Sequence, residues 1–184
     1  ISGNLDITVN TTTFPIAVPA NGSTRPLDAL DDRLFAACIR NGRLWTAHNI
    51  QVDASGVAST TGGRNGSRWY EITDLSTTPA VFQSGTIFDP TAVSPSSYWI
   101  PTVMVSGQGH AAFIFSRSGS SVKANTATTG RLSGDVLGTT QLVSTITSST
   151  FNYNVQPSGT QRWGDYSNMS LDPDDNMTMW GVAG

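Results

Sequence analysis

A tight-turn signal recurs three times along this chain, and an apolar run follows each turn. The turns lie at Asn41-Gly42, Gln108-Gly109 and Asp174-Asp175, so successive turns are 67 and 66 residues apart. Asn-Gly is among the strongest short-range signals for a hairpin. A repeat of this length corresponds to one four-stranded antiparallel sheet per period. The spacing therefore predicts successive blades of a β-propeller-type fold, in which equivalent strand ends meet around one channel.

Composition favours the all-β class. Ser and Thr supply 46 of the 184 residues, whereas the chain has one Lys (Lys123) and one Glu (Glu71). Helices usually recruit Glu, Lys, Ala and Leu, while Thr and Val suit strands. At this length we expect a single domain, residues 1–184, able to bury about 70% of the surface that its unfolded chain exposes.

The expected strands form two blades and a half. A polar lead over residues 1–30, with an extended segment at 6–14, precedes a first blade at 31–95, a second at 96–160 and a half blade at 161–184. The strands are expected at residues 33–40, 43–52, 68–73, 80–88, 100–105, 110–117, 122–128, 139–147, 166–171 and 177–182. Two to three blades do not close a ring, and an open sheet edge invites pairing. We therefore expect either a fragment of a longer propeller or completion by a homo-oligomer.

Charge and hydropathy narrow the partners and the location. The net charge is −3 and the nine Arg are scattered, which argues against nucleic acid as a partner. No run of 18 apolar residues occurs, so no membrane insertion is expected. The chain starts at Ile1 without Met or a signal peptide, as a processed product would, and this favours a secreted, extracellular protein.

The single Cys and the two His residues are expected to have structural roles. Cys38 has no partner for an internal disulfide and lies in an apolar run, so we expect a buried small hydrophobe. His48 and His110 lie in separate units, without a second ligand at metal-binding spacing.

Near the C-terminus, a motif runs Arg162-Trp163-Gly164-Asp165-Tyr166-Ser167 and continues through Ser170, Asp172, Thr178 and Trp180. This motif resembles a blade signature of secreted bacterial β-propeller proteins related to the sialidase, or Asp-box (BNR), superfamily. Segments 31–34, 44–48 and 68–72 share the resemblance. It implies a propeller with a structural role for the motif's tryptophans, and either carbohydrate binding or sialidase-like hydrolysis.

Register identifies a candidate ligand site. Superimposing the turns aligns Arg33 with Ile100 and Tyr166, all at starts of first strands. In a propeller such starts gather around one mouth of the channel. Aromatic faces beside carboxylates and guanidinium groups suit a polar ring such as a sugar. The expected ligand-binding residues are Asp31, Asp32, Arg33, Tyr98, Trp99, Arg162, Asp165 and Tyr166.

Three functions remain open at this point. The first is an extracellular module that binds glycan or a cell-surface protein. The second is a sialidase-like glycoside hydrolase fragment, in which Asp32 and Asp165 would supply the carboxylates and Tyr166 the nucleophile. The third is a structural module of a larger secreted protein. Because the only Glu, Glu71, lies on an expected outer strand, binding is favoured over catalysis.

An acidic turn raises the question of calcium. Asp172, Asp174 and Asp175 place three carboxylates in one short connection, and calcium prefers oxygen ligands. The turn lacks the sixth-position Gly and the terminal Glu of an EF-hand loop, so a solvated turn is the alternative. No other cofactor is expected.

Overall fold

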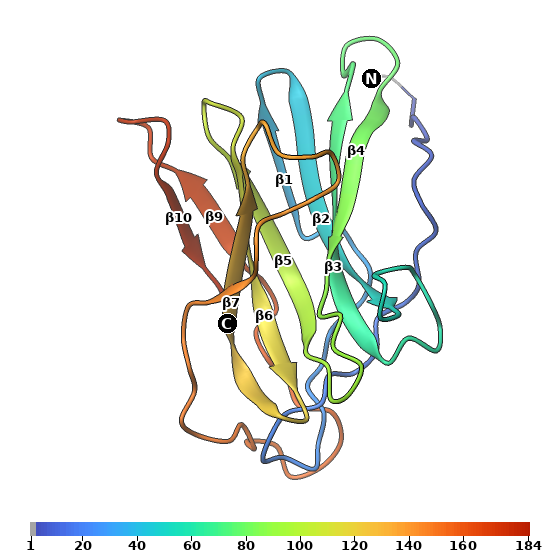
Figure 1. The fold of residues 1–184 in the computed structure, drawn as a ribbon, viewed down its shortest axis with the longest axis vertical. Helices are drawn as coiled ribbons and strands as arrows, with labels where there is room; N and C mark the ends of the chain where they lie inside the picture. The colour runs from blue at the N-terminus through green and yellow to red at the C-terminus, as the bar shows by residue number, and fades with distance from the viewer. Residues whose placement is uncertain (1–2) are drawn as a thin grey trace.

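The structure is a computed structural model that describes residues 3–184, and these residues contain strands and loops but no helix (Figure 1). Within this range the strands form three antiparallel sheets of four, four and two strands, none of them closed. The first sheet contains β1 (Ala36–Arg40), β2 (Arg43–Val52), β3 (Arg64–Thr73) and β4 (Ala80–Ile87). The second contains β5 (Ser97–Val105), β6 (Ala111–Gly119), β7 (Val122–Arg131) and β8 (Ser144–Thr145). The third contains β9 (Asn168–Leu171) and β10 (Met179–Val182).

The all-β class and the antiparallel order of strands are confirmed. Residues 6–14, expected to be extended, belong to no strand, and the strand expected at 139–147 shrinks to Ser144–Thr145. The second difference has a local cause. Asp135 accepts the Leu132 N–H at 2.9 Å and Gly138 adopts a φ of 77°, so turns occupy the connection that follows β7.

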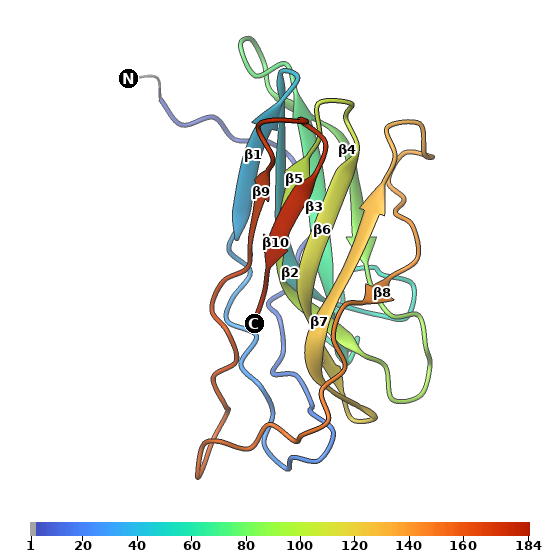
Figure 2. The ribbon, with the colours of Figure 1, turned by 90° about the vertical axis from the view of Figure 1, so that its left-hand side faces the viewer.

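The sheets stack face to face in chain order (Figure 1). β5 packs against β1, β2 and β3 of the first sheet, β9 packs against β5, and β10 packs against β6. The first strands of the three sheets lie toward the same side of the stack, as Figure 2 shows from the β9–β10 side. This arrangement is a multi-sheet stack, and its assignment to a propeller remains a prediction.

The main core lies between the two four-stranded sheets. Trp69 stacks on Trp45 with 5.6 Å between ring centroids and meets Phe113 of β6 at the same distance. Trp69 and Phe113 are fully buried. Gly85 of β4 provides room for the indole, because a Cβ atom there would lie 2.7 Å from Trp69. Large rings from both sheets thus interdigitate around a small residue.

A second core closes the end of the stack at which β1, β5 and β9 start. Two loops meet there, and the fully buried side-chain amide of Gln161 binds the backbone of both. Its Nε2 donates to the carbonyls of Arg25 (3.2 Å) and Tyr153 (3.1 Å), and its Oε1 accepts the Val155 N–H at 2.9 Å. One side chain therefore satisfies backbone groups that irregular loops leave without strand partners.

Candidate functional site

Two side chains tie together the starts of β1, β5 and β9. Asn49 of β2 is fully buried, and its Nδ2 donates to the carbonyls of Ala29 (3.1 Å) and Asp31 (3.0 Å). Its Oδ1 accepts the N–H of Ile100 at 3.0 Å, while the Ser167 hydroxyl donates to the Ile100 carbonyl at 2.8 Å. The backbones of the three strand starts that the sequence register aligns are therefore linked.

Ile100 adopts an unusual backbone conformation between these two partners. Its φ is 52°, in the left-handed region that β-branched residues rarely occupy, and Pro101 follows it. The pairing of β5 with β6 is irregular between Trp99 and Thr102. Asn49 and Ser167 bind the N–H and the carbonyl of Ile100, one in each of the two peptide units that flank its Cα atom, and hold the strained residue in place.

Tyr98 and Trp99 lie in the protein interior. Tyr98 packs in the main core against Phe115, with 5.1 Å between ring centroids. Trp99 is fully buried in the second core beside Leu27. β5 is buried on both faces because it lies between two sheets, so its aromatic residues cannot present a face to an external ligand.

Five of the eight expected ligand-binding residues share one exposed surface, which we call the Tyr166 face: Asp31, Arg33, Arg162, Asp165 and Tyr166. Arg33 donates from Nε to Asp31 at 2.6 Å, and Arg162 forms an ion pair with Asp165. The Tyr166 side chain is 70% exposed, and its hydroxyl lies near enough to both Arg33 and Arg162 to contribute to the raised pKa of each. An accessible aromatic ring thus lies near two guanidinium–carboxylate pairs.

The ion pairs set the charge state of this face. The hydrogen bond from the Arg33 side chain lowers the pKa of Asp31 to about 2. The Arg162 side chain likewise lowers the pKa of Asp165, and each carboxylate raises the pKa of its Arg partner. Both carboxylates are therefore ionised at neutral pH and serve as hydrogen-bond acceptors beside guanidinium donors.

Asp32 lies beside this face but interacts through its backbone. Its carbonyl accepts a hydrogen bond from His48 Nδ1 at 2.7 Å, and the other ring nitrogen of His48 lies 3.1 Å from the Tyr70 hydroxyl. Within residues 3–184 the Asp32 carboxylate has no ion pair or hydrogen bond. Burial lowers the pKa of His48, which favours the neutral imidazole.

The neutral His48 makes stability depend on pH. In the unfolded chain the His48 imidazole takes up a proton near the ordinary histidine pKa of about 6.5, whereas in the folded chain its lowered pKa disfavours protonation. The free energy of unfolding should therefore be constant above about pH 6.5 and fall below it, by at most about 1.4 kcal/mol per pH unit. Urea unfolding between pH 7.5 and 5 measures this. His48→Gln should flatten the profile; equal slopes in the parent and His48→Gln would contradict the assignment.

The acidic turn between β9 and β10 is organised by its own backbone. Asp172 accepts the Asp174 N–H at 3.0 Å, and Asp175 accepts the N–H groups of Met177 and Thr178 at 2.8 Å. Among the described residues no three His, Cys, Asp or Glu side chains form a group suited to a metal ion. Calcium binding by this turn stays a prediction.

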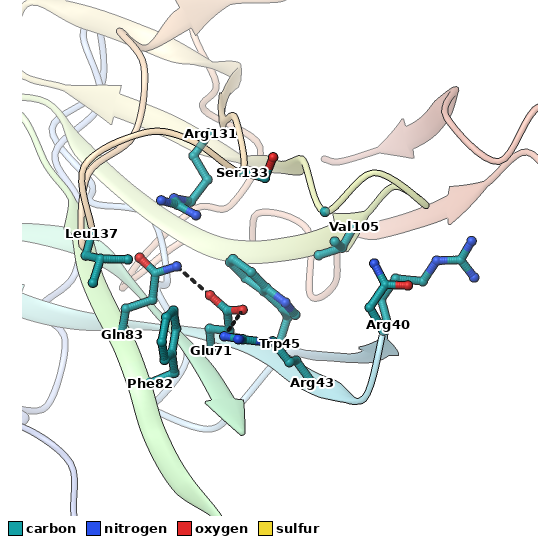
Figure 3. Close-up of a pocket in the computed structure, with 12 residues that line it drawn as sticks. Arg40, Arg43, Trp45, Glu71, Phe82, Gln83, Val105, Arg131, Ser133 and Leu137 are labelled. Atoms are coloured by element: carbon teal, nitrogen blue, oxygen red, sulfur yellow. Dashed lines mark hydrogen bonds and ion pairs between the residues drawn. The ribbon is translucent and has the colours of Figure 1, made fainter. Parts of the chain in front are cut away.

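A second candidate site lies between the first two sheets, where β1 and β5 end, and therefore at the opposite end of the strands from the Tyr166 face. This interlayer pocket has a volume of about 280 Å³. Figure 3 shows Arg131 directed from β7 toward Gln83 and Glu71 on the facing sheet. The charged and aromatic residues that line the pocket are Arg40, Arg43, Glu71, Arg131, Trp45 and Phe82.

The sequence alone does not reveal the interlayer pocket. Its residues come from strands of two sheets, and no motif connects Arg131 with Glu71. One feature of the sequence relates to this pocket. Arg43 and Glu71 occupy neighbouring strands, and in the structure they form an ion pair at 2.8 Å. A Glu that is unique in the chain and an Arg in the adjacent hairpin could have marked this end of the stack.

The comparisons with known proteins leave the family open: no family model, curated protein or solved structure matches the chain. The resemblance to Asp-box propellers therefore remains a prediction. In the described residues no helix has the length and apolar character to cross a membrane.

Proposed function

We propose that this protein binds carbohydrate at the Tyr166 face. The observation that carries the proposal is the exposed Tyr166 ring near two Arg–Asp pairs. A sugar presents a C–H face that packs on an aromatic ring and hydroxyl groups that both donate and accept hydrogen bonds. The pairs Arg33–Asp31 and Arg162–Asp165 supply charged donors and acceptors for those hydroxyls.

The supporting structure gives this face a fixed geometry. Asn49 and Ser167 hold the neighbouring strand starts from beneath through hydrogen bonds of 2.8–3.0 Å to Asp31 and Ile100. A binding surface whose backbone is already ordered loses less conformational entropy when the ligand arrives. These hydrogen bonds therefore favour the interpretation of the Tyr166 face as an ordered binding surface and not as an unconstrained loop.

The charge state supports binding over hydrolysis. A glycoside hydrolase uses a carboxylic acid that protonates the leaving group, and such an acid needs a raised pKa. Of the two carboxylates that the hydrolase would use, Asp165 is paired with Arg162, which lowers its pKa and makes it a poor proton donor. We therefore place sugar binding above sialidase-like hydrolysis, and above a purely structural role that requires no exposed ring beside paired charges.

A glycan array followed by calorimetry of the selected sugar tests this function. Tyr166→Ala should weaken binding about tenfold or more, since it removes the stacking surface from the centre of the site. Trp180→Ala is the matched control, because Trp180 is 65% exposed but lies on β10, outside the Tyr166 face. The folded state of each variant is checked by its unfolding midpoint.

Three outcomes would contradict the proposal. The first is a parent protein that selects no glycan on the array, which would favour a structural module. The second is unchanged affinity in Tyr166→Ala, which would place the sugar elsewhere. The third is release of a shortened glycan during incubation, which would favour the hydrolase.

A further inference from the structure

A further pocket, which we call the Arg68 pocket, lies on the side of the first sheet that faces away from the second. Trp69 points into the main core, so Arg68 faces the opposite side of β3, because successive side chains of a strand alternate. Residues 3–14 run along that side of the sheet (Figure 1). Together with β3, β4 and the loop after β2, they form a pocket of about 550 Å³. Its polar side chains are Asn10, Thr11, Arg68, Ser84 and Thr86.

Arg68 brings an uncompensated positive charge to this pocket. It is only 5% exposed, and its Nε donates to the Thr86 hydroxyl at 2.6 Å. Its Nη1 is buried without a hydrogen-bond partner among residues 3–184, where Arg68 also forms no ion pair. The nearby Tyr70 hydroxyl lies 3.1 Å from His48 Nε2 and does not serve Nη1. A buried guanidinium without a counter-ion is costly unless a ligand supplies one.

The rest of the lining is neutral and rich in hydrogen-bonding groups. No Asp or Glu from the described part of the chain lines the pocket. The side chains of Asn10, Thr11 and Ser84 make no hydrogen bond within residues 3–184. Hydroxyl and amide groups can each donate and accept, which suits the hydroxyl substituents of a ligand.

The shape of the pocket favours a hydroxylated ligand over an aromatic one. No aromatic ring lines the pocket in the described residues, and its apolar side chains are those of Val57 and Ala58. A volume of about 550 Å³ corresponds to about 18 water molecules. A six-membered ring with several hydroxyl groups and one anionic group fits in this space.

We infer that the Arg68 pocket binds a small hydroxylated carboxylate, with the carboxylate paired with Arg68 and the hydroxyl groups on Thr11 and Ser84. The planar guanidinium matches a carboxylate, and a charge-assisted hydrogen bond is stronger than a neutral one. This site is separate from the Tyr166 face and does not depend on the function proposed there.

The test uses glucuronate as the probe, at pH 7 and constant ionic strength, with the backbone amide signals of Gly56 and Gly85 followed by NMR. Both glycines line the pocket. Glucuronate should shift the two signals saturably. Glucose, which lacks the carboxylate, and benzoate, which lacks the hydroxyl groups, should each bind at least tenfold more weakly. Equal responses to glucuronate and either analogue, or tighter binding of inorganic phosphate, would overturn the assignment.

Variants locate the bound probe. Arg68→Gln should weaken glucuronate binding about tenfold or more, because it removes the charged donor. Val57→Glu should weaken it as strongly, since the new carboxylate either repels the probe or occupies Arg68. Val57 is 58% exposed, so this variant should fold, and Val182→Glu on β10 is the matched control at 67% exposure. If Arg68→Gln does not fold, Val57→Glu decides: unchanged affinity in that variant would refute the site.

Tyr166→Ala distinguishes this site from the Tyr166 face. It should leave the glucuronate response of Gly56 and Gly85 unchanged, whereas a loss of that response would place the probe at the Tyr166 face and overturn the Arg68 pocket.

Discussion

Replacing Trp69 with alanine should lower the free energy of unfolding by about 3 to 5 kcal/mol, a large share of the ~5–15 kcal/mol that stabilises a typical domain. Trp69 is fully buried and contacts Trp45 of its own sheet and Phe113 of the next. Its removal leaves a cavity between the sheets that surrounding strands cannot fill. Its indole N–H has no partner among the described residues, so losing this group offsets part of the cost.

Urea unfolding of Trp69→Ala beside Trp180→Ala measures this difference. Trp180 is exposed on β10, so its removal should change the free energy of unfolding by less than about 1 kcal/mol. Trp69→Phe should lie between the two, because a smaller ring fills part of the space. Similar midpoints for Trp69→Ala and Trp180→Ala would show that the sheets are not packed around Trp69.

Asn49→Asp should destabilise the protein by about 3 to 5 kcal/mol although it changes only one group of atoms. The buried amide donates to the carbonyls of Ala29 and Asp31. A carboxylate cannot donate, and it would place negative charge against those two carbonyl oxygens. The loss should be smaller at low pH, because a protonated carboxyl recovers one donor.

Urea unfolding of Asn49→Asp and of the exposed Asn4→Asp separates the effect of burial from the effect of added charge. Asn4→Asp should leave stability nearly unchanged. Because Asn49 fixes the backbone of Asp31, Asn49→Asp should also weaken sugar binding at temperatures where the protein remains folded. An Asn49→Asp protein as stable as Asn4→Asp would mean that the strand starts are held by other contacts.

The hairpins were predictable from the sequence because their signals are local. The turn Asn41-Gly42 gives Asn41 and Gly42 positive φ values of 50° and 72°, which these residue types tolerate, and β2 occupies the expected residues 43–52. The alignment of Arg33 with Ile100 and Tyr166 also follows from local spacing. The structure links the neighbouring backbone of these strand starts through Asn49 and Ser167.

Side-chain direction and contacts between sheets were beyond the sequence. Tyr98 and Trp99 lie at the aligned strand start, yet their side chains enter the two cores because β5 is covered on both faces. Register fixes the position of a residue along a strand, whereas burial depends on neighbouring sheets that no local pattern describes. The interlayer pocket depends on the same long-range packing, since Arg131 and Glu71 are 60 residues apart in the chain.

The division of the main core between two sheets also has a consequence for the nascent chain. The first sheet ends at Ile87, but the strands that cover Trp45 and Trp69 are complete only at Arg131, 44 residues later. At a synthesis rate of about 5–20 residues per second, this interval lasts about 2 to 9 s. During that time the aromatic face of the first sheet has no partner sheet, so the growing polypeptide presents to chaperones the same surface that later becomes its interior.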